Sequence, residues 1–335
     1  MRLVAVQNLK PDMVVGKTII GSNGQILLRQ GVKLTDRYID HLRRHWIEVV
    51  YISTGSNVAP QDVIRDQTRI KALSETRQVL GRVKRGADLE IEQVNQVLVA
   101  IIDELLLQDS LMINLVDIRS HDEELFHHSV NVAILSTIVG IELEYSQKKL
   151  RKLAVSALLH DIGKLFSEDE REHLKLARRL LREKSDLDAG VVNAICQHHE
   201  HWDGQGYPAG LSGSEICQDA RILQVTNTFD NMSTNSRYPM EEVIEYLMGQ
   251  SGTQFEPASV RAFLNCVSFY PVGTMVELNT GERGVVLRSN RGFPTRPVVR
   301  VEQNQFGKVE PCYEVDLAVH PTYFVKNRLD EVTEG

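Results

Sequence analysis

Extended and helical patterns alternate in the first sixty residues. Apolar runs at 14–20 and 26–28 flank Asn23-Gly24, a pair that favours a tight hairpin turn. Thr35 is a preferred residue type for capping the start of a helix, and the apolar residues that follow recur at helical spacing. The β-branched and aromatic residues at 49–52 predict a further strand. This part of the chain is therefore predicted to form a small α/β domain.

A helical pattern extends almost without interruption from residue 62 to residue 265. One predicted helix carries its apolar positions at Ile70, Leu73, Val79 and Val83, and the next at Ile91, Val94, Val97, Ile101 and Leu105. Such stripes need a partner surface, so this segment is expected to contain the large core. Packing within the chain is the default expectation, and pairing of these helices in a homodimer is the alternative.

Short alternating runs replace the helical pattern near the C-terminus. They lie at 275–278, 284–287 and 298–301, and Gly281, Gly292 and Pro297 separate them. We therefore expect three domains: a small N-terminal α/β domain at 1–60, a helical domain at 61–265 and a β-rich extension at 266–335. The fold class is mainly α.

Composition limits the classes of protein that fit. The 335 residues are 42% hydrophobic and 25% charged, values of an ordinary folded chain that exclude wholesale disorder. The net charge of -7 leaves no basic excess for a nucleic-acid backbone, so binding to long nucleic acid is not expected. No apolar stretch reaches the ~18 clean residues of a membrane helix, and the first residues hold no apolar run of the length of a signal peptide, so neither is expected. The four cysteines match no metal knuckle or disulfide framework, which predicts reduced thiols and a cytoplasmic protein.

Histidines are concentrated in the helical segment. Eight of the eleven fall between residues 121 and 201: His121, His127, His128, His160, His173, His198, His199 and His201. A lone histidine is usually a surface residue or a satisfied core residue. Eight of them interleaved with carboxylates on helices are typical of a metal centre.

The spacing of these residues supports a metal centre. Glu124 and His128 are four residues apart, so one face of a helix can direct both toward one ion. His160 and Asp161 follow an apolar run, and an unpaired buried His-Asp pair would be unfavourable unless it bound a cation. Lys164 is expected on the same helical face as His160, where its ammonium can meet a bound anion.

A glycine-rich loop follows the last histidines. His198-His199-Glu200-His201 adds further nitrogen donors, and Gly206, Tyr207 and Pro208 come directly after in a turn. Such a loop can bring backbone N–H groups close to a phosphate, although a plain helix-ending turn has the same composition.

These motifs together resemble the HD-GYP domains, a subgroup of the HD superfamily of metal-dependent phosphohydrolases that cleave cyclic di-GMP. The resemblance runs from about Glu124 to Tyr238 through His128-Ser, His160-Asp-Ile-Gly-Lys164, His173, His198-His-Glu200, Asp203-Gly-x-Gly-Tyr-Pro208 and Ala220-Arg-Ile-Leu. It implies an all-helical bundle of the HD type. The first 60 residues also look like a small domain that precedes HD-GYP domains in some bacterial proteins.

The resemblance implies a site with two or three divalent ions, typically iron or manganese. Its ligands would be Glu124, His128, His160, Asp161, His173, His198 and His199, with Asp161 bridging two ions. Lys164 would contact the phosphate, and Gly206, Tyr207 and Pro208 would shape the pocket wall. The reaction would be hydrolysis by a hydroxide that bridges the ions.

The chain departs from the family pattern at two places. Asn227 stands where the family has a ligand Asp, and its amide oxygen can still coordinate a hard ion but carries no charge. Asp230 matches a second Asp of the pattern and is expected to be structural. The phosphate-binding arginine of the family is displaced by one position here, to Arg237.

Two functions are compatible with these residues. The first is a bacterial signalling phosphodiesterase that hydrolyses cyclic di-GMP to linear pGpG, GMP or both. The alternative is a catalytically impaired receptor that binds the cyclic dinucleotide and signals through its flanking domains, and Asn227 favours it. A phosphohydrolase for mononucleotides is disfavoured by the His-His-Glu and Gly-Tyr-Pro motifs.

Overall fold

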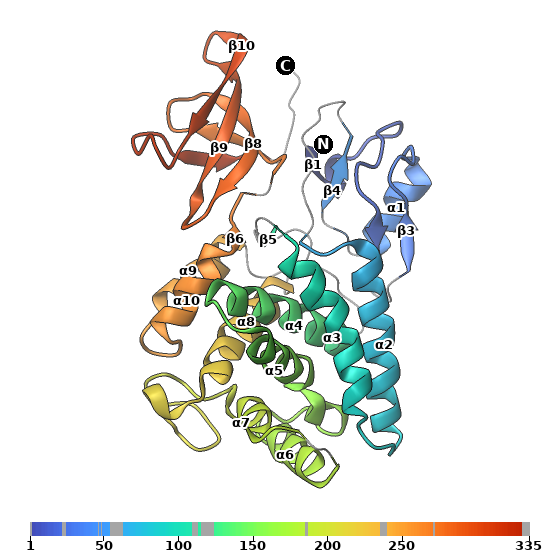
Figure 1. Ribbon diagram of the computed structural model, residues 1–335. Helices are drawn as coiled ribbons and strands as arrows, with labels where there is room; N and C mark the ends of the chain where they lie inside the picture. Colours follow the sequence, from blue (N-terminus) through green and yellow to red (C-terminus); the bar gives the residue numbers. More distant parts are fainter. Residues whose placement is uncertain are drawn as a thin grey trace. The chain divides into compact units, whose positions relative to one another are not determined.

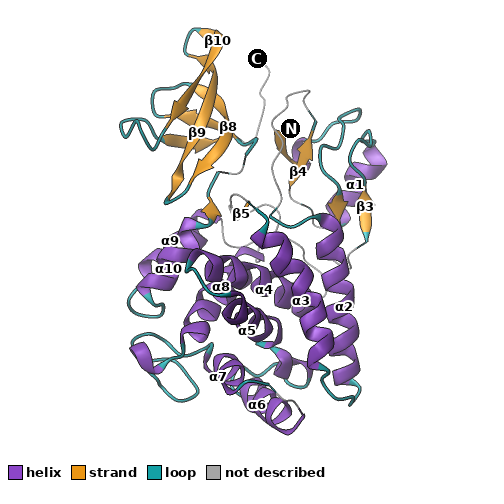
Figure 2. Cartoon of the chain, viewed as in Figure 1, coloured by secondary structure: helices purple, strands orange, loops and turns teal. Residues whose placement is uncertain are grey.

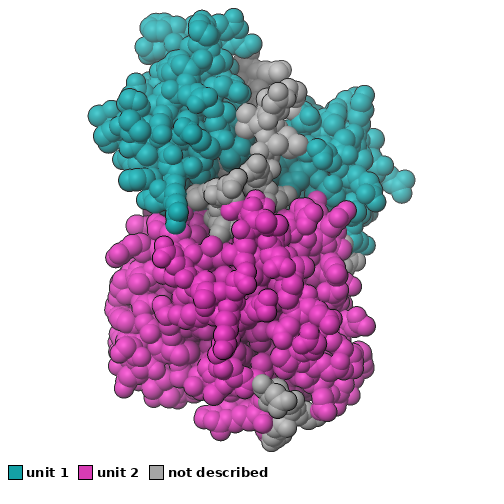
Figure 3. Space-filling view, viewed as in Figure 1, with its two compact units in different colours: residues 1–62, 112–121, 267–335 teal, residues 63–111, 122–266 magenta. Residues whose placement is uncertain are grey.

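The computed structural model describes residues 2–21, 25–45, 47, 49–53, 63–108, 113–114, 124–184, 187–234, 240–270 and 272–329. The chain divides into two compact units (Figure 3), one made of residues 63–111 and 122–266 and the other of residues 1–62, 112–121 and 267–335. The predicted division into three domains stays a prediction. The mainly helical fold class is confirmed, with the strands gathered outside the helical unit (Figure 2).

The helical unit contains the elements that carry the candidate site (Figure 1). Its helices are α2 Asp66–Lys84, α3 Ile91–Leu106, α4 Glu124–Glu142, α5 Gln147–Leu159, α6 Glu172–Lys184, α7 Ala189–Gln197, α8 Gln218–Thr234, α9 Met240–Gly249 and α10 Pro257–Asn265. Two short 3-10 helices, η3 Ile162–Leu165 and η4 Gly213–Glu215, lie in the connections. Both helices predicted from apolar spacing near the start of this unit are confirmed as α2 and α3.

Helix α4 is the central helix of this unit. Residues 127–140 are buried without exception, because α2, α5, α8 and α10 all pack against it. Among the described residues, the segment Leu125–Glu142 is long and apolar enough to cross a membrane, but 78% of it is buried inside the unit. An apolar surface on every side is what a buried core helix requires. The predicted cytoplasmic location and lack of membrane insertion stay predictions.

The N-terminal segment contains the predicted helix and the predicted strands at 26–28 and 49–52, but the extended run expected at 14–20 forms a strand only at its end, and a strand at its start was not predicted. Strand β1 Arg2–Ala5 pairs antiparallel with β4 Val49–Ile52, and β2 Ile19–Ile20 pairs with β3 Ile26–Leu28. A short 3-10 helix, η1 Val6–Asn8, follows β1. Thr35 caps α1 Asp36–Arg44, because its hydroxyl oxygen accepts a hydrogen bond from the Tyr38 N–H at 3.3 Å. The predicted Asn23-Gly24 turn lies outside the described residues.

The C-terminal segment forms an antiparallel five-stranded sheet in the order β10-β9-β8-β7-β11. Its strands are β7 Met275–Leu278, β8 Arg283–Asn290, β9 Phe293–Asn304, β10 Gly307–Asp316 and β11 Val325–Arg328. Its core consists of valines and leucines that alternate along the strands: Val276, Leu278, Val286, Val299, Val301, Val315 and Leu317. Pro297 lies inside β9, so the expectation that it separates two strands is wrong. Strand β9 is bulged, and its neighbours β8 and β10 both pair with it in spite of the proline. Strand β5 Ile113–Asn114 pairs in parallel with β6 Val267–Ser268.

Candidate metal centre

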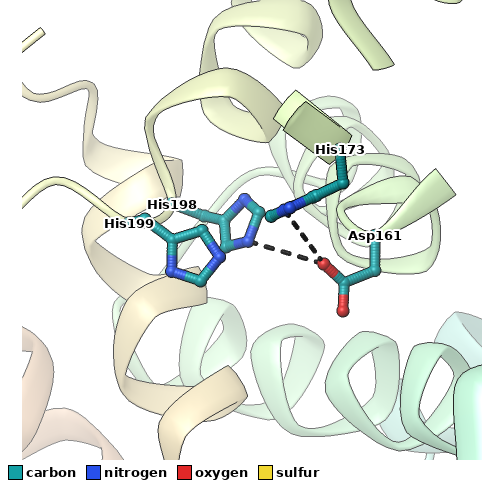
Figure 4. Close-up of side chains that lie close together, drawn as sticks. All are labelled: Asp161, His173, His198 and His199. Carbon is teal, nitrogen blue, oxygen red and sulfur yellow. Dashed lines mark ion pairs between the residues drawn. The ribbon is translucent and has the colours of Figure 1, made fainter. Parts of the chain in front are cut away.

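Four segments of the helical unit bring the predicted ligands together. His128 lies in the second turn of α4, and His173 lies at the start of α6. His160 and Asp161 occupy the turn between α5 and η3, and His198 and His199 directly follow α7. Figure 4 shows Asp161 facing three of the imidazoles.

The turn after α5 differs from the expectation. The helix ends at Leu159, so His160 and Lys164 do not share a helical face, and that prediction is wrong. Instead η3 returns the chain toward Asp161, and the Lys164 ammonium lies 2.8 Å from Asp161 Oδ2. Lys164 therefore still reaches the centre, through its ion pair with Asp161, three residues earlier in the chain.

Asp161 belongs to two groups of donor atoms. One group consists of Asp161, His173, His198 and His199, and the other of His128, His160 and Asp161; in each, the atoms lie within 4.8 Å of one another. Asp161 Oδ1 lies 3.5 Å from His173 Nε2 and 3.7 Å from His198 Nε2 (Figure 4). Asp161 Oδ2 lies 3.4 Å from His160 Nε2. One carboxylate with an oxygen in each group is placed as a bridging ligand would be.

Backbone carbonyls determine the tautomers of three of these histidines. His160 Nδ1 donates to the carbonyl of Ala157 at 2.8 Å. His198 Nδ1 donates to the carbonyl of Ile195 at 2.7 Å, and His173 Nδ1 donates to the carbonyl of Asp169 at 3.1 Å. A carbonyl oxygen can only accept, so each Nδ1 carries a proton and each neutral ring keeps its lone pair on Nε2. All three lone pairs point toward Asp161, which is the orientation of metal-binding imidazoles.

His128 is oriented by a carboxylate. Its Nδ1 lies 2.7 Å from Asp230 Oδ2 on α8, and its Nε2 lies 3.1 Å from His160 Nε2. Carboxylate–histidine pairs of this kind orient metal ligands from the side away from the ion. Asp230 thus supports His128, in keeping with the structural role expected for it.

The donor atoms fit a divalent metal ion. Among the described residues, Asp161 Oδ1 and the Nε2 atoms of His173, His198 and His199 are buried and have no hydrogen-bond partner. Buried polar atoms without partners are rare because each one costs free energy. Imidazole nitrogens with a carboxylate oxygen suit iron, manganese or zinc, so a bound cation would satisfy all of these atoms together.

The protonation states also suit cation binding. Burial, reinforced by the neighbouring imidazoles, holds the pKa of His198 well below its usual range and lowers the pKa of His199 to about 3. Burial would raise the pKa of Asp161, but His160 and Lys164 hold it well below its usual range. Burial would also lower the pKa of His128, yet the hydrogen bond and charge of Asp230 raise it. The centre therefore offers a carboxylate at Asp161 and neutral imidazoles at His198 and His199, whereas His128 keeps its proton more readily.

Two motif glycines allow the segments to approach so closely. A Cβ atom on Gly163 would lie 1.9 Å from the carbonyl oxygen of His173. A Cβ atom on Gly206 would lie 2.2 Å from the backbone nitrogen of His201. No side chain fits at either position, so these glycines permit the backbone contacts that bring α6 and the Gly-Tyr-Pro loop to the centre.

The Gly-Tyr-Pro loop covers one side of His199. The ring of Tyr207 stacks on the imidazole with centroids 4.8 Å apart and planes at 18°. The Tyr207 hydroxyl donates to Glu170 Oε2 at 3.0 Å. Glu200 anchors the end of the loop, since its carboxylate accepts from the N–H groups of Ala209 and Leu211.

Several predicted site residues are not placed in this cluster. Asn227 is buried on α8, and its amide oxygen accepts from Asn231 Nδ2 at 2.8 Å. Glu124 opens α4, but its side chain lies outside the described part of the structure, as do Arg237 and His121. His127, another of the clustered histidines, is buried on α4, and burial lowers the pKa of its ring to about 4.

Glu170 is not distinguished by any local pattern in the sequence. This residue lies in the connection between η3 and α6, three positions before His173, and only the fold brings it to Tyr207 and His199. Its position among other acidic residues in the sequence gave no signal that could have distinguished it.

Comparisons with known proteins agree with this fold and centre. The HD domain family matches residues 111–258, and a KOW domain associated with the HD domain matches residues 275–333. The fold and the His-Asp centre therefore define an HD-domain protein whose centre is able to bind metal. The match to the HD domain family and the similarity to three cyclic di-GMP phosphodiesterases support an HD-GYP member of that family.

Three relatives illustrate the similarity. A cyclic di-GMP phosphodiesterase of Pseudomonas aeruginosa is 32% identical in an alignment of 227 residues that covers 62% of this chain and 55% of the relative. A cyclic di-GMP phosphodiesterase of Thermotoga maritima is 31% identical over 43% of this chain and 45% of the relative. A 3'3'-cGAMP-specific phosphodiesterase of Vibrio cholerae is 30% identical over 41% of this chain and 35% of the relative. The chain thus spans about half the length, or less, of the curated relatives it matches.

Proposed function

We propose that this chain is a metal-dependent phosphodiesterase that hydrolyses cyclic di-GMP to linear pGpG, GMP or both. The observation that carries this proposal is the convergence of imidazole lone pairs on Asp161, with the Nδ1 atoms held by backbone carbonyls. Two relatives that bear the name cyclic di-GMP phosphodiesterase support the choice of substrate.

The proposed centre holds two or three divalent ions, with iron or manganese favoured by the mixed donor set. Asp161 is shared by the two donor groups, which supports its role as the bridging ligand. The proposed ligand set is Glu124, His128, His160, Asp161, His173, His198, His199 and Asn227. When bound, the ions would supply Lewis-acid stabilisation of the phosphoryl oxygens and a water of lowered pKa.

The residues around this centre bind and orient the substrate. The Lys164 ammonium lies beside Asp161, so a phosphate oxygen that approaches Asp161 comes within its reach. Gly206, Tyr207 and Pro208 form the wall next to His199. Arg237 is proposed as a second cation for the phosphate. The substrate is accordingly a compact phosphodiester held by its charge.

A receptor without catalysis is the second candidate, and Asn227 favours it. The amide is neutral, and it already accepts a hydrogen bond from Asn231. A ligand position without negative charge weakens the hold on an ion and raises the pKa of bound water. The receptor would bind the cyclic dinucleotide and leave it intact.

Anaerobic incubation with cyclic dinucleotides tests the proposal. The chain is reconstituted with Fe(II) or Mn(II), its metal content is measured, and cyclic di-GMP and 3'3'-cGAMP are supplied in parallel. Linear product that disappears on chelation supports the phosphodiesterase, and the faster substrate identifies the preferred dinucleotide. Intact substrates with metal shown to be bound would refute it and favour the receptor.

A further inference from the structure

Glu170 lies at the open edge of the centre. Its side chain is 63% exposed, and Oε2 lies 3.6 Å from His199 Nε2. That separation exceeds the length of a hydrogen bond. Two donor atoms bound at about 2.1 Å to one ion, at angles between a right angle and a tetrahedral one, lie roughly 3.0 to 3.4 Å apart. The two atoms are therefore within a few tenths of an ångström of the separation that a shared ion requires.

Tyr207 holds the carboxylate in this place. Its hydroxyl donates to Glu170 Oε2 at 3.0 Å, and its ring stacks on the imidazole of His199. The guanidinium of Arg171 lies 5.0 Å from the centroid of the same ring, a cation–π contact. These three contacts restrict the Tyr207 ring, and its hydroxyl holds the Glu170 carboxylate near His199.

His199 is the least enclosed member of its donor group. Its side chain is 18% exposed, whereas those of His173 and His198 are fully buried. Its Nε2 has no hydrogen-bond partner among the described residues. The donor group of Asp161, His173, His198 and His199 leaves room for a further ligand, and the Glu170 carboxylate lies next to this Nε2.

We propose that Glu170 is an additional metal ligand of this centre, bound to the same ion as His199, and that Tyr207 is the residue that positions it. The proposal rests on the metal centre put forward above. It adds one anionic oxygen, supplied by the segment that precedes α6, to the donor group of Asp161, His173, His198 and His199.

Metal titration of the full chain tests this assignment without reference to activity. Mn(II) is added to the metal-free protein, and free Mn(II) is followed by electron paramagnetic resonance. Glu170→Gln keeps an oxygen that can accept from Tyr207 but removes the charge, and we expect about tenfold weaker binding at one site. Tyr207→Phe keeps the stacked ring and should weaken the same site less. Glu172→Gln is the matched control, since Glu172 is exposed and pairs only with Lys175 among the described residues.

A double-mutant cycle separates a shared ligand from a general charge effect. His199→Ala is expected to abolish the site that both residues share, so Glu170→Gln then has no further effect on Mn(II) binding. A Glu170→Gln titration that superimposes on that of the wild type, or a Glu170→Gln substitution that weakens binding of the ions remaining after His199→Ala has abolished one site, would overturn the assignment. Failure of the proposed function looks different: the wild type then binds Mn(II) and Glu170→Gln still weakens one site, but the wild type does not hydrolyse the dinucleotides.

Discussion

Replacing Gly163 with alanine tests whether the close approach of η3 to α6 determines the metal centre. The added Cβ would lie 1.9 Å from the carbonyl oxygen of His173, a backbone atom that cannot rotate away. Contacts of this kind do not fall below about 3 Å, so the two segments must separate by about 1 Å. In the wild type, His173 Nε2 lies 3.5 Å from Asp161 Oδ1.

A shift of this size matters more for the metal than for the fold. Metal–ligand distances are tolerated to within ~0.2 Å, so a displacement of about 1 Å removes His173 from its donor group. Overpacking of a buried site costs about 1 to 3 kcal/mol, which leaves most domains folded. We expect Gly163→Ala to bind one metal ion fewer per chain, to lose at least a hundredfold in hydrolysis and to unfold at a slightly lower temperature.

Metal analysis by mass spectrometry, product chromatography and thermal unfolding measure the three effects. Gly81→Ala in α2 is the matched control, because the nearest atom to its Cβ would be Arg85 Nη1 at 3.6 Å. That substitution should leave metal content unchanged and stabilise the helix by about 1 kcal/mol. Full metal content and unchanged melting in Gly163→Ala would refute the argument from close packing.

Three further predictions follow from the same centre. Asp161→Ala should strip metal from both donor groups with helical circular dichroism retained; unchanged metal content would disprove the bridging role. Asn227→Asp should raise Mn(II) affinity and hydrolysis by adding a charge, and a loss of both would mean that the amide is suited to this site. Burial lowers the pKa values of His173, His198 and His199 in the folded state, that of His199 to about 3. An unfolded histidine has a pKa of about 6.5, so below that pH the unfolded chain binds more protons than the folded chain. The contribution of these three imidazoles to the stability of the metal-free protein should therefore be full above pH 7 and fall as the pH drops, by about 2 kcal/mol at pH 5 for His199 alone. The raised pKa of His128 contributes with the opposite sign, and the three lowered values outweigh it. Equal unfolding temperatures at pH 7 and pH 5 in the presence of chelator would contradict this sign.

Local sequence patterns determined much of this protein. The spacing of apolar residues predicts α2 and α3, the Thr35 cap predicts the start of α1, and alternation predicts the core strands of the C-terminal sheet. These features depend on contacts between near neighbours, which a single sequence displays directly. The residue types of the centre were also visible, because histidine and aspartate cluster where an apolar helical pattern leads into them.

Only the tertiary structure decided how those residues meet. The end of α5 at Leu159 turns His160 and Asp161 toward ligands up to 38 positions away, and no local pattern reports that turn. The role of Glu170 is invisible in the sequence for the same reason, since an exposed glutamate among other acidic residues acquires meaning only beside Tyr207 and His199. Periodicity encodes which face of an element is buried, whereas the meeting of donor atoms from four segments depends on backbone contacts such as that of Gly163 with His173.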